Sequence, residues 1–414
     1  KFVRRKGDTL EVAGRAYDLS RYSGIYIFGA GKASAAMARP LEEILGEAIT
    51  DGTVVVKYGY SLPLKRIRVR EAGHPLPDKA GLEATEKIVD MLKKTGEKDL
   101  IFMLISGGGS ALLCLPPAGI SLDEIQETTQ ILLGCGANIH ELNAARKHLS
   151  LVKGGRLAKY AYPSTLISLL LSDVIGDKLE SIASGPCVPD SSSFSDCLAI
   201  LDKYRIRKKI PAAVLDFLEK GVRGEAEETL KKGHPAFEKT LNVIIGNNKM
   251  ALEGAERKAS RLGYNTHILP FEIQGEAREA AISHSVLASR ILLSNQPVEK
   301  PACVISGGET TVTVKGKGKG GRSQEFVLAA AIGIEGLENV VILSAGTDGT
   351  DGPTDAAGAL ADGKTVERAR KLGLDARHFL KENDSYHFFK RLGGLIITGP
   401  TLTNVMDLQL ILVG

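Results

Sequence analysis

The strongest constraint on the fold is a pattern that recurs along the chain, in which a short apolar run is followed by a glycine-rich turn. Runs of this kind occupy residues 24–28, 100–105, 303–306 and 340–344, and segments with helical spacing lie between them. The runs are apolar at consecutive positions, which is typical of strands that helices cover on both faces. Alternating strands and helices predict an α/β protein with largely parallel sheets.

Other segments extend this pattern. Ser121 and Glu124 form a capping-box sequence, which predicts a helix start there. The remaining expected strands are 53–57, 67–70, 166–171, 242–245, 310–315, 395–398 and 410–413, and the expected helices are 33–45, 81–95, 248–262, 276–293 and 323–332.

The segment 203–239 interrupts the alternation. It is rich in Lys and Glu, contains three glycines and shows no strand pattern, and a new strand is expected directly after it. The length of 414 residues suits two domains, each large enough for its own core. We therefore expect a Rossmann-like domain at 1–237 and a smaller α/β domain at 238–414.

Composition narrows the class of protein. The net charge is +4 and the basic residues form no dominant block, which argues against nucleic acid as a partner and favours a small anionic molecule. The five cysteines are odd in number and include no CxxC pair, so neither a disulfide framework nor a zinc site is expected. No apolar run reaches the ~18–20 residues that span a bilayer. These features predict a cytoplasmic protein that works without a membrane.

The first glycine-rich loop contains Gly29, Gly31 and Lys32 and leads into a helix. Free N–H groups at a helix start suit an anion, and Lys32 adds a full charge. The spacing is not that of a Walker A loop, and Ser34 stands where a dinucleotide fingerprint needs its third glycine. A purely structural turn is the alternative.

The second loop runs from Ser106 to Ser110 through three successive glycines. Glycine costs conformational entropy, so three in a row need a reason beyond packing. A nest of backbone amides that binds phosphate supplies that reason. The candidate phosphate-binding residues are Gly29, Gly31, Ser106, Gly107, Gly108, Gly109 and Ser110.

The third loop, residues 315–322, carries Lys315, Lys317, Lys319 and Arg322 among four glycines. Its composition predicts a mobile basic loop that closes over a polyphosphate, and a solvated turn is the alternative. Arginine fits carboxylate and phosphate in a bidentate manner, so Arg322 is the strongest candidate of the four.

The fourth loop places Asp348, Asp351 and Asp355 directly after a strand. Clustered carboxylates suit a hard cation such as Mg²⁺, although Asx-turns would use the same residues without a metal. Asp348 and Asp351 are the candidate metal ligands, and Asp173 is an alternative that could also orient an acceptor hydroxyl.

A basic helical stretch supplies Arg146, Lys147, Lys153 and Arg156, and Asp173 follows a strand at the end where α/β folds place ligands. The candidate substrate-binding residues are Arg146, Lys147 and Asp173. Which of Arg146, Lys147 and Arg322 would face an anionic substrate is left open by the sequence.

Taken together, these strings resemble the glycerate 2-kinase family from about residue 24 to the C-terminus, and the second half resembles its MOFRL domain. The motifs that carry the resemblance are Gly29-Ala-Gly-Lys32, Ser106-Gly-Gly-Gly-Ser110, Arg146-Lys-His-Leu-Ser150, Ser172-Asp-Val174, Gly320-Gly-Arg-Ser-Gln-Glu325, the Gly346–Asp355 loop and Gly399-Pro-Thr401.

The resemblance implies two α/β domains with an active-site cleft between them. It implies transfer of the ATP γ-phosphoryl group to the 2-hydroxyl of D-glycerate with a divalent cation, and Lys32 and Arg322 as catalytic residues. A monomer or homodimer is expected. Two alternatives remain from the residues, an NAD(P)-dependent hydroxypyruvate reductase and a non-catalytic sensor of small phosphorylated acids.

Overall fold

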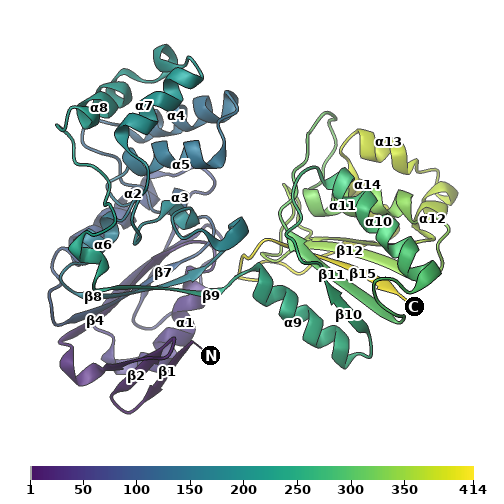
Figure 1. Ribbon diagram of the computed structural model, residues 1–414, viewed down its shortest axis with the longest axis horizontal. Coiled ribbons are helices and arrows are strands. Elements are labelled where there is room, and N and C mark those ends of the chain that lie inside the picture. The colour runs from purple at the N-terminus through teal and green to yellow at the C-terminus, as the bar shows by residue number, and fades with distance from the viewer. Residues whose placement is uncertain (1) are drawn as a thin grey trace. The chain divides into compact units, whose positions relative to one another are not determined.

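The computed structural model describes residues 2–414, which divide into two compact units (Figure 1). The first unit ends at Ile245 and the second comprises Gly246–Gly414. The expected boundary at residue 237 falls earlier than this division. Strand β9 (Thr240–Gly246) accounts for the difference, because it is hydrogen-bonded to β8 (Thr165–Leu171) in the sheet of the first unit.

A sheet of six strands in the order β6-β5-β4-β7-β8-β9 forms the centre of the first unit. The strands β6 (Arg68–Ala72), β5 (Asp51–Lys57), β4 (Gly24–Ala30), β7 (Asp99–Ile105) and β8 pair in parallel. Residues on β4 and β7 such as Phe28 and Phe102 are fully buried, because helices cover both faces of these strands. The expectation of a Rossmann-like parallel sheet is confirmed.

Two of the helices around this sheet begin at the glycine-rich turns after β4 and β7. Helix α1 (Ser34–Leu45) follows β4, α3 (Gly109–Leu112) follows β7, and α2 (Lys79–Leu92) and α6 (Arg156–Ala161) pack in the core that contains Phe28. The parallel topology therefore brings the turns after β4 and β7 to the same edge of the sheet.

A helical layer with its own apolar core completes the first unit. It contains α4 (Leu122–Gly134), α5 (Ile139–His148), α7 (Phe194–Lys203) and α8 (Ala212–Val222), packed around residues such as Phe194 and Leu218. The predicted capping box is present at the start of α4, where Ser121 and Glu124 bond reciprocally.

The N-terminal segment forms a separate antiparallel sheet that the sequence did not predict. Its strands are β1 (Val3–Lys6), β2 (Thr9–Val12) and β3 (Arg15–Asp18). They are short and largely exposed, with only Leu10 and Val12 buried, so no long apolar run marks them in the sequence.

The second unit also has a six-stranded sheet, in the order β10-β11-β15-β12-β13-β14. Only the pairing of β10 (Asn265–Ile268) with β11 (Ala302–Gly308) is parallel. The other pairings, which join β15 (Asp407–Val413), β12 (Val340–Gly346), β13 (Gly358–Asp362) and β14 (Leu395–Ile396), are antiparallel. The expectation of largely parallel sheets is therefore wrong for this unit, since the C-terminal strand β15 inserts between β11 and β12.

Helices cover both faces of the second sheet (Figure 1). Helices α10 (Ala277–Ser294) and α11 (Arg322–Gly333) pack around Phe326 with α12 (Thr365–Lys371), α13 (Ala376–Lys381) and α14 (Ser385–Leu392). Helix α9 (Asn248–Arg261) packs on the other face against Cys303 and Ile305. None of the helices in residues 2–414 is long and apolar enough to cross a membrane.

The strand expected at 310–315 is absent. Thr311 makes only an isolated bridge with Glu276, and the Thr313 hydroxyl donates to the Glu276 carboxylate. This segment therefore forms a loop although its apolar and polar residues alternate, and Val314 in the loop is exposed.

Candidate active site

The turns after β4 and β7 are bonded to each other in the first unit. The backbone N–H of Lys32 donates to the carbonyl oxygen of Gly107 at 2.8 Å, and the N–H of Ala33 donates to the Ser106 hydroxyl at 3.0 Å. Gly31 has φ = +139°, and a Cβ atom added there would lie 2.1 Å from the Ser106 Oγ atom. Glycine at position 31 is thus required by the close approach of the two loops.

Several of the candidate phosphate-binding residues support this arrangement. Ser106 is buried with its hydroxyl already bonded. A Cβ on Gly29 would meet the carbonyl oxygen of Leu104 at 2.3 Å, and the N–H of Gly109 donates to the Ser106 carbonyl at 3.1 Å. The Ser34 hydroxyl donates to the Leu104 carbonyl, so this serine joins the helix to the neighbouring strand.

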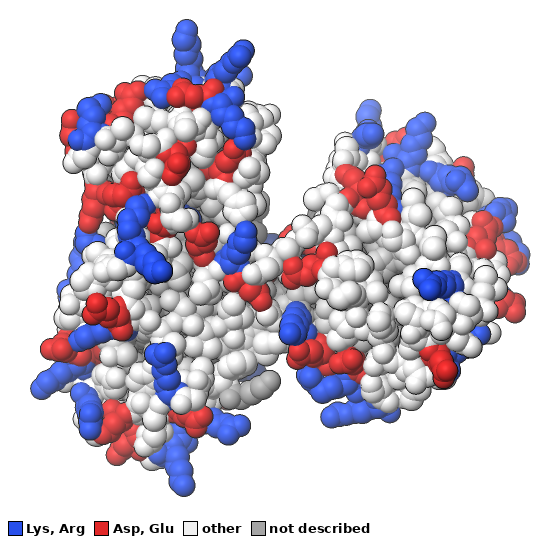
Figure 2. All heavy atoms as spheres, in the orientation of Figure 1, with Lys and Arg blue, Asp and Glu red and all other residues white. Residues whose placement is uncertain are grey.

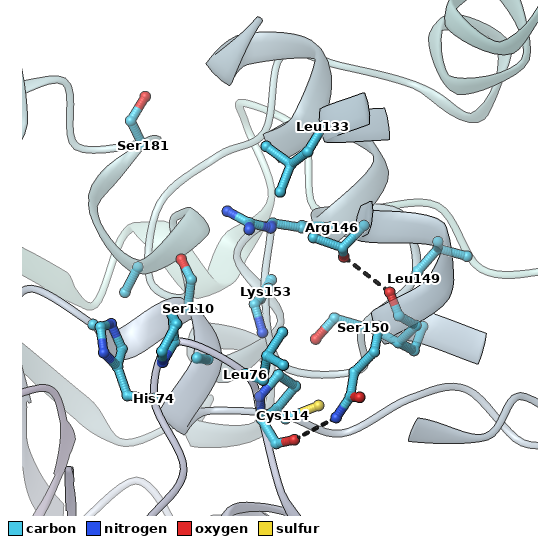
Figure 3. Close-up of a pocket in the computed structure, with 18 of the residues that line it drawn as sticks. His74, Leu76, Ser110, Cys114, Leu133, Arg146, Leu149, Ser150, Lys153 and Ser181 are labelled. Atoms are coloured by element: carbon cyan, nitrogen blue, oxygen red, sulfur yellow. Dashed lines mark hydrogen bonds between the residues drawn. The ribbon is translucent and has the colours of Figure 1, made fainter. Parts of the chain in front are cut away.

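Ser110 and Gly108, in contrast, border a cavity of about 380 Å³ in the first unit (Figure 3). The Ser110 and Ser184 hydroxyl oxygens are 2.9 Å apart. Gly108 has φ = +86°, and a Cβ there would lie 2.9 Å from the Cδ2 atom of His74, so glycine lets the ring of His74 pack against the turn. The lining of the cavity includes His74, Ser110, Arg146, Ser150, Lys153 and Asp173.

Two cationic side chains enter this cavity from different segments (Figure 3). Arg146 lies in the last turn of α5, and Lys153 lies in the loop before α6. Within residues 2–414, neither forms a salt bridge with an acidic side chain, and burial lowers the pKa of both, that of Lys153 to about 8. A buried cation without an acidic partner is costly, which favours an anion from outside the protein.

The neighbouring basic residues have different roles. The Lys147 ammonium donates to Asp190 at 2.9 Å, and Lys147 does not line the cavity. Arg156 is buried and donates to the carbonyl oxygens of Lys147, Ser150 and Glu227, which satisfies the end of α5. Lys147 and Arg146 were equal candidates from the sequence, but Arg146 lines the cavity whereas Lys147 is paired with Asp190 outside its lining.

The other candidates of the first unit lie near these turns. Asp173 lines the cavity, at the end of β8 where the sequence placed it. Lys32 is half-buried, and its Cγ atom is 3.6 Å from the position that a Cβ on Gly108 would take. His74 also lines the cavity, and the sequence assigned it no role because no triad pattern surrounds it.

In the second unit, Arg322 is held between two carboxylates. Its Nε and Nη2 atoms donate to the two oxygens of Asp407 at 2.6 and 2.9 Å, and its Nη1 atom donates to Glu309. Burial alone would lower the pKa of Arg322, but the bonds and charge of Asp407, together with Glu309, raise it. The guanidinium is therefore fixed in orientation and always charged.

Asp351 accepts three hydrogen bonds from the start of α11. Its Oδ1 atom accepts from the N–H of Ser323, and its Oδ2 atom accepts from the N–H and the side-chain amide of Gln324. Burial raises the pKa of Asp351 to about 6 even though these bonds lower it. Asp351 thus acts as the cap of α11, and both oxygens that a metal would need are already used.

Asp348 takes part in a turn within the same loop. One of its carboxylate oxygens accepts from the N–H and the hydroxyl of Thr350, which is a local turn. In residues 2–414, no three His, Cys, Asp or Glu side chains come together as a group that could hold a metal ion. The assignment of Asp348 and Asp351 as metal ligands stays a prediction.

The backbone of the basic loop 315–321 is hydrogen-bonded to the side chains of Asn383 and Asp384, and its mobility stays a prediction. The N–H groups of Lys315 and Gly316 donate to the Asn383 side chain, and the N–H of Lys319 donates to Asp384. A Cβ on Gly316 would lie 2.2 Å from the carbonyl oxygen of Glu382. Close packing therefore explains this glycine.

Sequence reasoning gave no weight to Asp407 and Glu309, the partners of Arg322. Asp407 is 85 positions from Arg322, so no local spacing joins them. A signal was present, since both acids lie at strand ends, where polar residues of an α/β fold gather.

Comparisons with known proteins agree with this architecture. Residues 1–219 match the family model described as a domain of unknown function, DUF4147, and residues 302–407 match the MOFRL family. A glycerate 2-kinase of Pyrococcus horikoshii is 45% identical over 99% of this chain and 92% of its own length. A putative hydroxypyruvate reductase of Agrobacterium vitis is 42% identical over 94% of this chain and 99% of its own length.

A solved structure extends the similarity to three dimensions. The crystal structure of a glycerate kinase from Thermotoga maritima has a TM-score of 0.86 and 43% identity, and the match covers 94% of this chain and 91% of that one. Similarity of this extent includes both units. The chain belongs to the glycerate 2-kinase family.

Proposed function

We propose that this protein is a glycerate 2-kinase that uses ATP. The 2-hydroxyl oxygen of D-glycerate forms a bond to the γ-phosphorus, the bond from that phosphorus to the bridging oxygen breaks, and the hydroxyl proton is released. The products are 2-phosphoglycerate and ADP. The observation that carries the proposal is 45% identity to a glycerate 2-kinase over nearly the whole chain.

The acceptor is placed in the cavity of the first unit. Arg146 supports this placement, because it is a cation without an acidic partner in the described residues and lines the cavity beside Ser110. It would bind the carboxylate of glycerate. Asp173 lines the same cavity and would accept a hydrogen bond from the 2-hydroxyl.

Phosphoryl transfer depends mainly on positioning and on stabilising charge. Lys32 and Arg322 are proposed to stabilise the transferring phosphoryl group, with the turn at Gly108 and Ser110 as further donors. The residues Gly29, Gly31, Ser106, Gly107 and Gly109 would support that turn through the contacts described above. The expected cleft between the domains stays a prediction.

A divalent cation is proposed to arrive with ATP, because the triphosphate itself offers the oxygens that Mg²⁺ prefers. Asp348 is the better candidate of the two predicted ligands, since both carboxylate oxygens of Asp351 accept hydrogen bonds from the start of α11. The cytoplasmic location and the state as monomer or homodimer also stay predictions.

The decisive test measures products. The purified protein is incubated with D-glycerate, ATP and Mg²⁺, and phosphorus NMR distinguishes 2- from 3-phosphoglycerate. Lys32→Ala should lower turnover by about 10²–10³-fold, which is the usual effect of removing one preorganised donor. A folded variant that keeps more than about a third of the turnover would show that Lys32 has a structural role.

Hydroxypyruvate reductase activity is the second candidate, because one relative carries that name. Reduction by NADH would require a dinucleotide site, yet Ser34 occupies the third glycine position and bonds to the neighbouring strand. NADH oxidation with hydroxypyruvate, measured by absorbance on the same preparation, is expected to be absent. Its presence without kinase activity would overturn the proposal.

A further inference from the structure

Lys153 is a buried cation that neither the motif analysis nor the proposed reaction assigns a role. Its residue is 4% exposed, and its ammonium donates to the carbonyl oxygen of Leu113. This bond uses one of three ammonium protons. No acidic side chain among residues 2–414 forms a salt bridge with it, and burial together with the charge of Arg146 disfavours the protonated form. An anion near Lys153 would remove this cost.

The surroundings of Lys153 match one particular anion. Arg146 and Lys153 border the same cavity from α5 and from the following loop, and the hydroxyls of Ser110 and Ser150 line it beside them (Figure 3). A guanidinium presents a planar fork, whereas an ammonium presents a compact charge. The two together suit a small carboxylate whose two oxygens face different donors.

The remaining wall of the cavity provides little charge. Leu76, Ile125, Leu133 and Leu149 line it, and the acidic residue in the lining is Asp173. Such a wall contributes shape but cannot distinguish an acid from an uncharged molecule of similar size. Discrimination by charge must therefore come from the cationic end.

We propose that Lys153 is a specificity-determining residue that binds the acceptor carboxylate together with Arg146. The pair makes the enzyme select 2-hydroxy acids over neutral polyols and aldehydes that carry the same hydroxyl. A neutral acceptor would leave the buried Lys153 and the half-buried Arg146 without a counter-charge. The inference rests on the proposed function in one respect, namely that the acceptor is glycerate.

The test compares an acid with a neutral analogue. Values of kcat/KM are measured with ATP for D-glycerate and D-glyceraldehyde, on the wild type and on Lys153→Met. Loss of a buried charge interaction should lower the value for D-glycerate by about 30-fold or more. The kcat/KM for D-glyceraldehyde should stay within about threefold of the wild-type value. The ratio of kcat/KM for D-glycerate to kcat/KM for D-glyceraldehyde should therefore fall.

The matched control is Lys231→Met. Lys231 also lies in the first unit and also donates to a backbone carbonyl, that of Ser192, but it does not line the cavity and has Glu228 as an acidic neighbour. This variant should keep the ratio of the wild type. An equal loss for both acceptors in Lys153→Met would mean that Lys153 only holds Leu113 in place, and the inference would be wrong.

A binding measurement separates this inference from the proposed function. Calorimetry without ATP measures the affinity for D-glycerate and for malonate, a small dicarboxylate that cannot be phosphorylated on carbon 2. Weaker binding in Lys153→Met than in Lys231→Met supports the inference, and equal binding overturns it. A wild-type protein that binds D-glycerate but forms no 2-phosphoglycerate would instead overturn the proposed kinase activity.

Discussion

Each unit carries an arginine that the sequence singled out, and the two are held in opposite ways. Arg146 in the first unit lines a cavity and has no acidic partner among residues 2–414. Arg322 in the second unit is bonded to Asp407 and Glu309. Burial lowers the pKa of Arg146, whereas the acids raise the pKa of Arg322 in spite of its burial.

This difference in partners indicates a different role for each cation. A buried cation without a partner gains most from a ligand, because the ligand supplies the missing charge. A cation that acids already neutralise gains less from an added anion but is held in one orientation. Arg146 therefore has the character of a binding group, and Arg322 that of a preorganised group. The two should respond differently to the same substitution.

The largest effect is expected on stability in the second unit. Arg322→Met leaves Asp407, 2% exposed, beside Glu309 and Asp348 without its cation. Removing one partner of a buried pair typically costs 3–5 kcal/mol, and the partial exposure of Arg322 suggests about 3 kcal/mol. Urea denaturation measures the change. The double variant Arg322→Met/Asp407→Leu should recover most of it, and a single variant within about 1 kcal/mol of wild type would contradict the prediction.

The same substitution at Arg146 should give a different result. Arg146→Met removes a cation that no acid compensates, so we expect the free energy of unfolding to stay unchanged or to increase. The KM for glycerate should increase about 30–100-fold, because a charge interaction with the carboxylate is lost. Denaturation and steady-state kinetics on one preparation test both. A marked loss of stability with an unchanged KM would remove the contrast between the two arginines.

The pH dependence of Lys153 sharpens the comparison further. Burial lowers its pKa to about 8, with Arg146 lowering it and Cys114 raising it, and His74 and Asp173 also line the cavity. Above about pH 8 the amine loses its proton, so the KM for glycerate should increase by at most about tenfold per pH unit.

The free energy of unfolding should also increase with pH, so the protein becomes more stable while its binding of glycerate weakens. The unfolded lysine keeps its proton up to about pH 10, so folding becomes more favourable as the pH rises from 8 to 10. Lys153→Met should show neither trend.

The smallest effect concerns Asp351, the cap of α11. Burial raises its pKa to about 6, above its ordinary 3.8, so the folded protein binds the extra proton. Its contribution to stability is fully present below about pH 4 and is lost as the pH rises through 6. We expect about 1 kcal/mol of added stability between pH 6 and pH 5, measured by urea denaturation. Asp351→Asn should lack this difference, and a variant with the same pH profile as wild type would show that another group titrates.

The predictability of the fold differs between the units. In the first unit, the apolar runs at 24–28 and 100–105 identified β4 and β7, and the topology is parallel as expected. In the second unit, the same kind of run identified β11 and β12 but not how they pair, because β15 enters between them. Strand order depends on contacts between distant segments, which an apolar run does not encode.

The prediction of the site was limited in the same way. The motifs located Arg146, Asp173 and the turn at Gly108 and Ser110, and the structure places them around one cavity. The same reasoning took Asp351 for a metal ligand, and the structure makes it a helix cap. A local pattern identifies a carboxylate, but the residues that bond to it come from elsewhere in the chain.

The α/β class, the glycine-rich turns and the membership of the family could be predicted from the amino-acid sequence alone. These depend on local spacing and on strings of residues that are read along the chain. The pairing of the charged side chains, in contrast, is seen only in the tertiary structure. Lys147 forms a salt bridge with Asp190 and Arg322 with Asp407, 43 and 85 positions away, while Arg146 and Lys153 form no salt bridge with an acid within residues 2–414. The physical reason is that the energy of a buried charge depends on the groups that folding brings within a few ångströms of it.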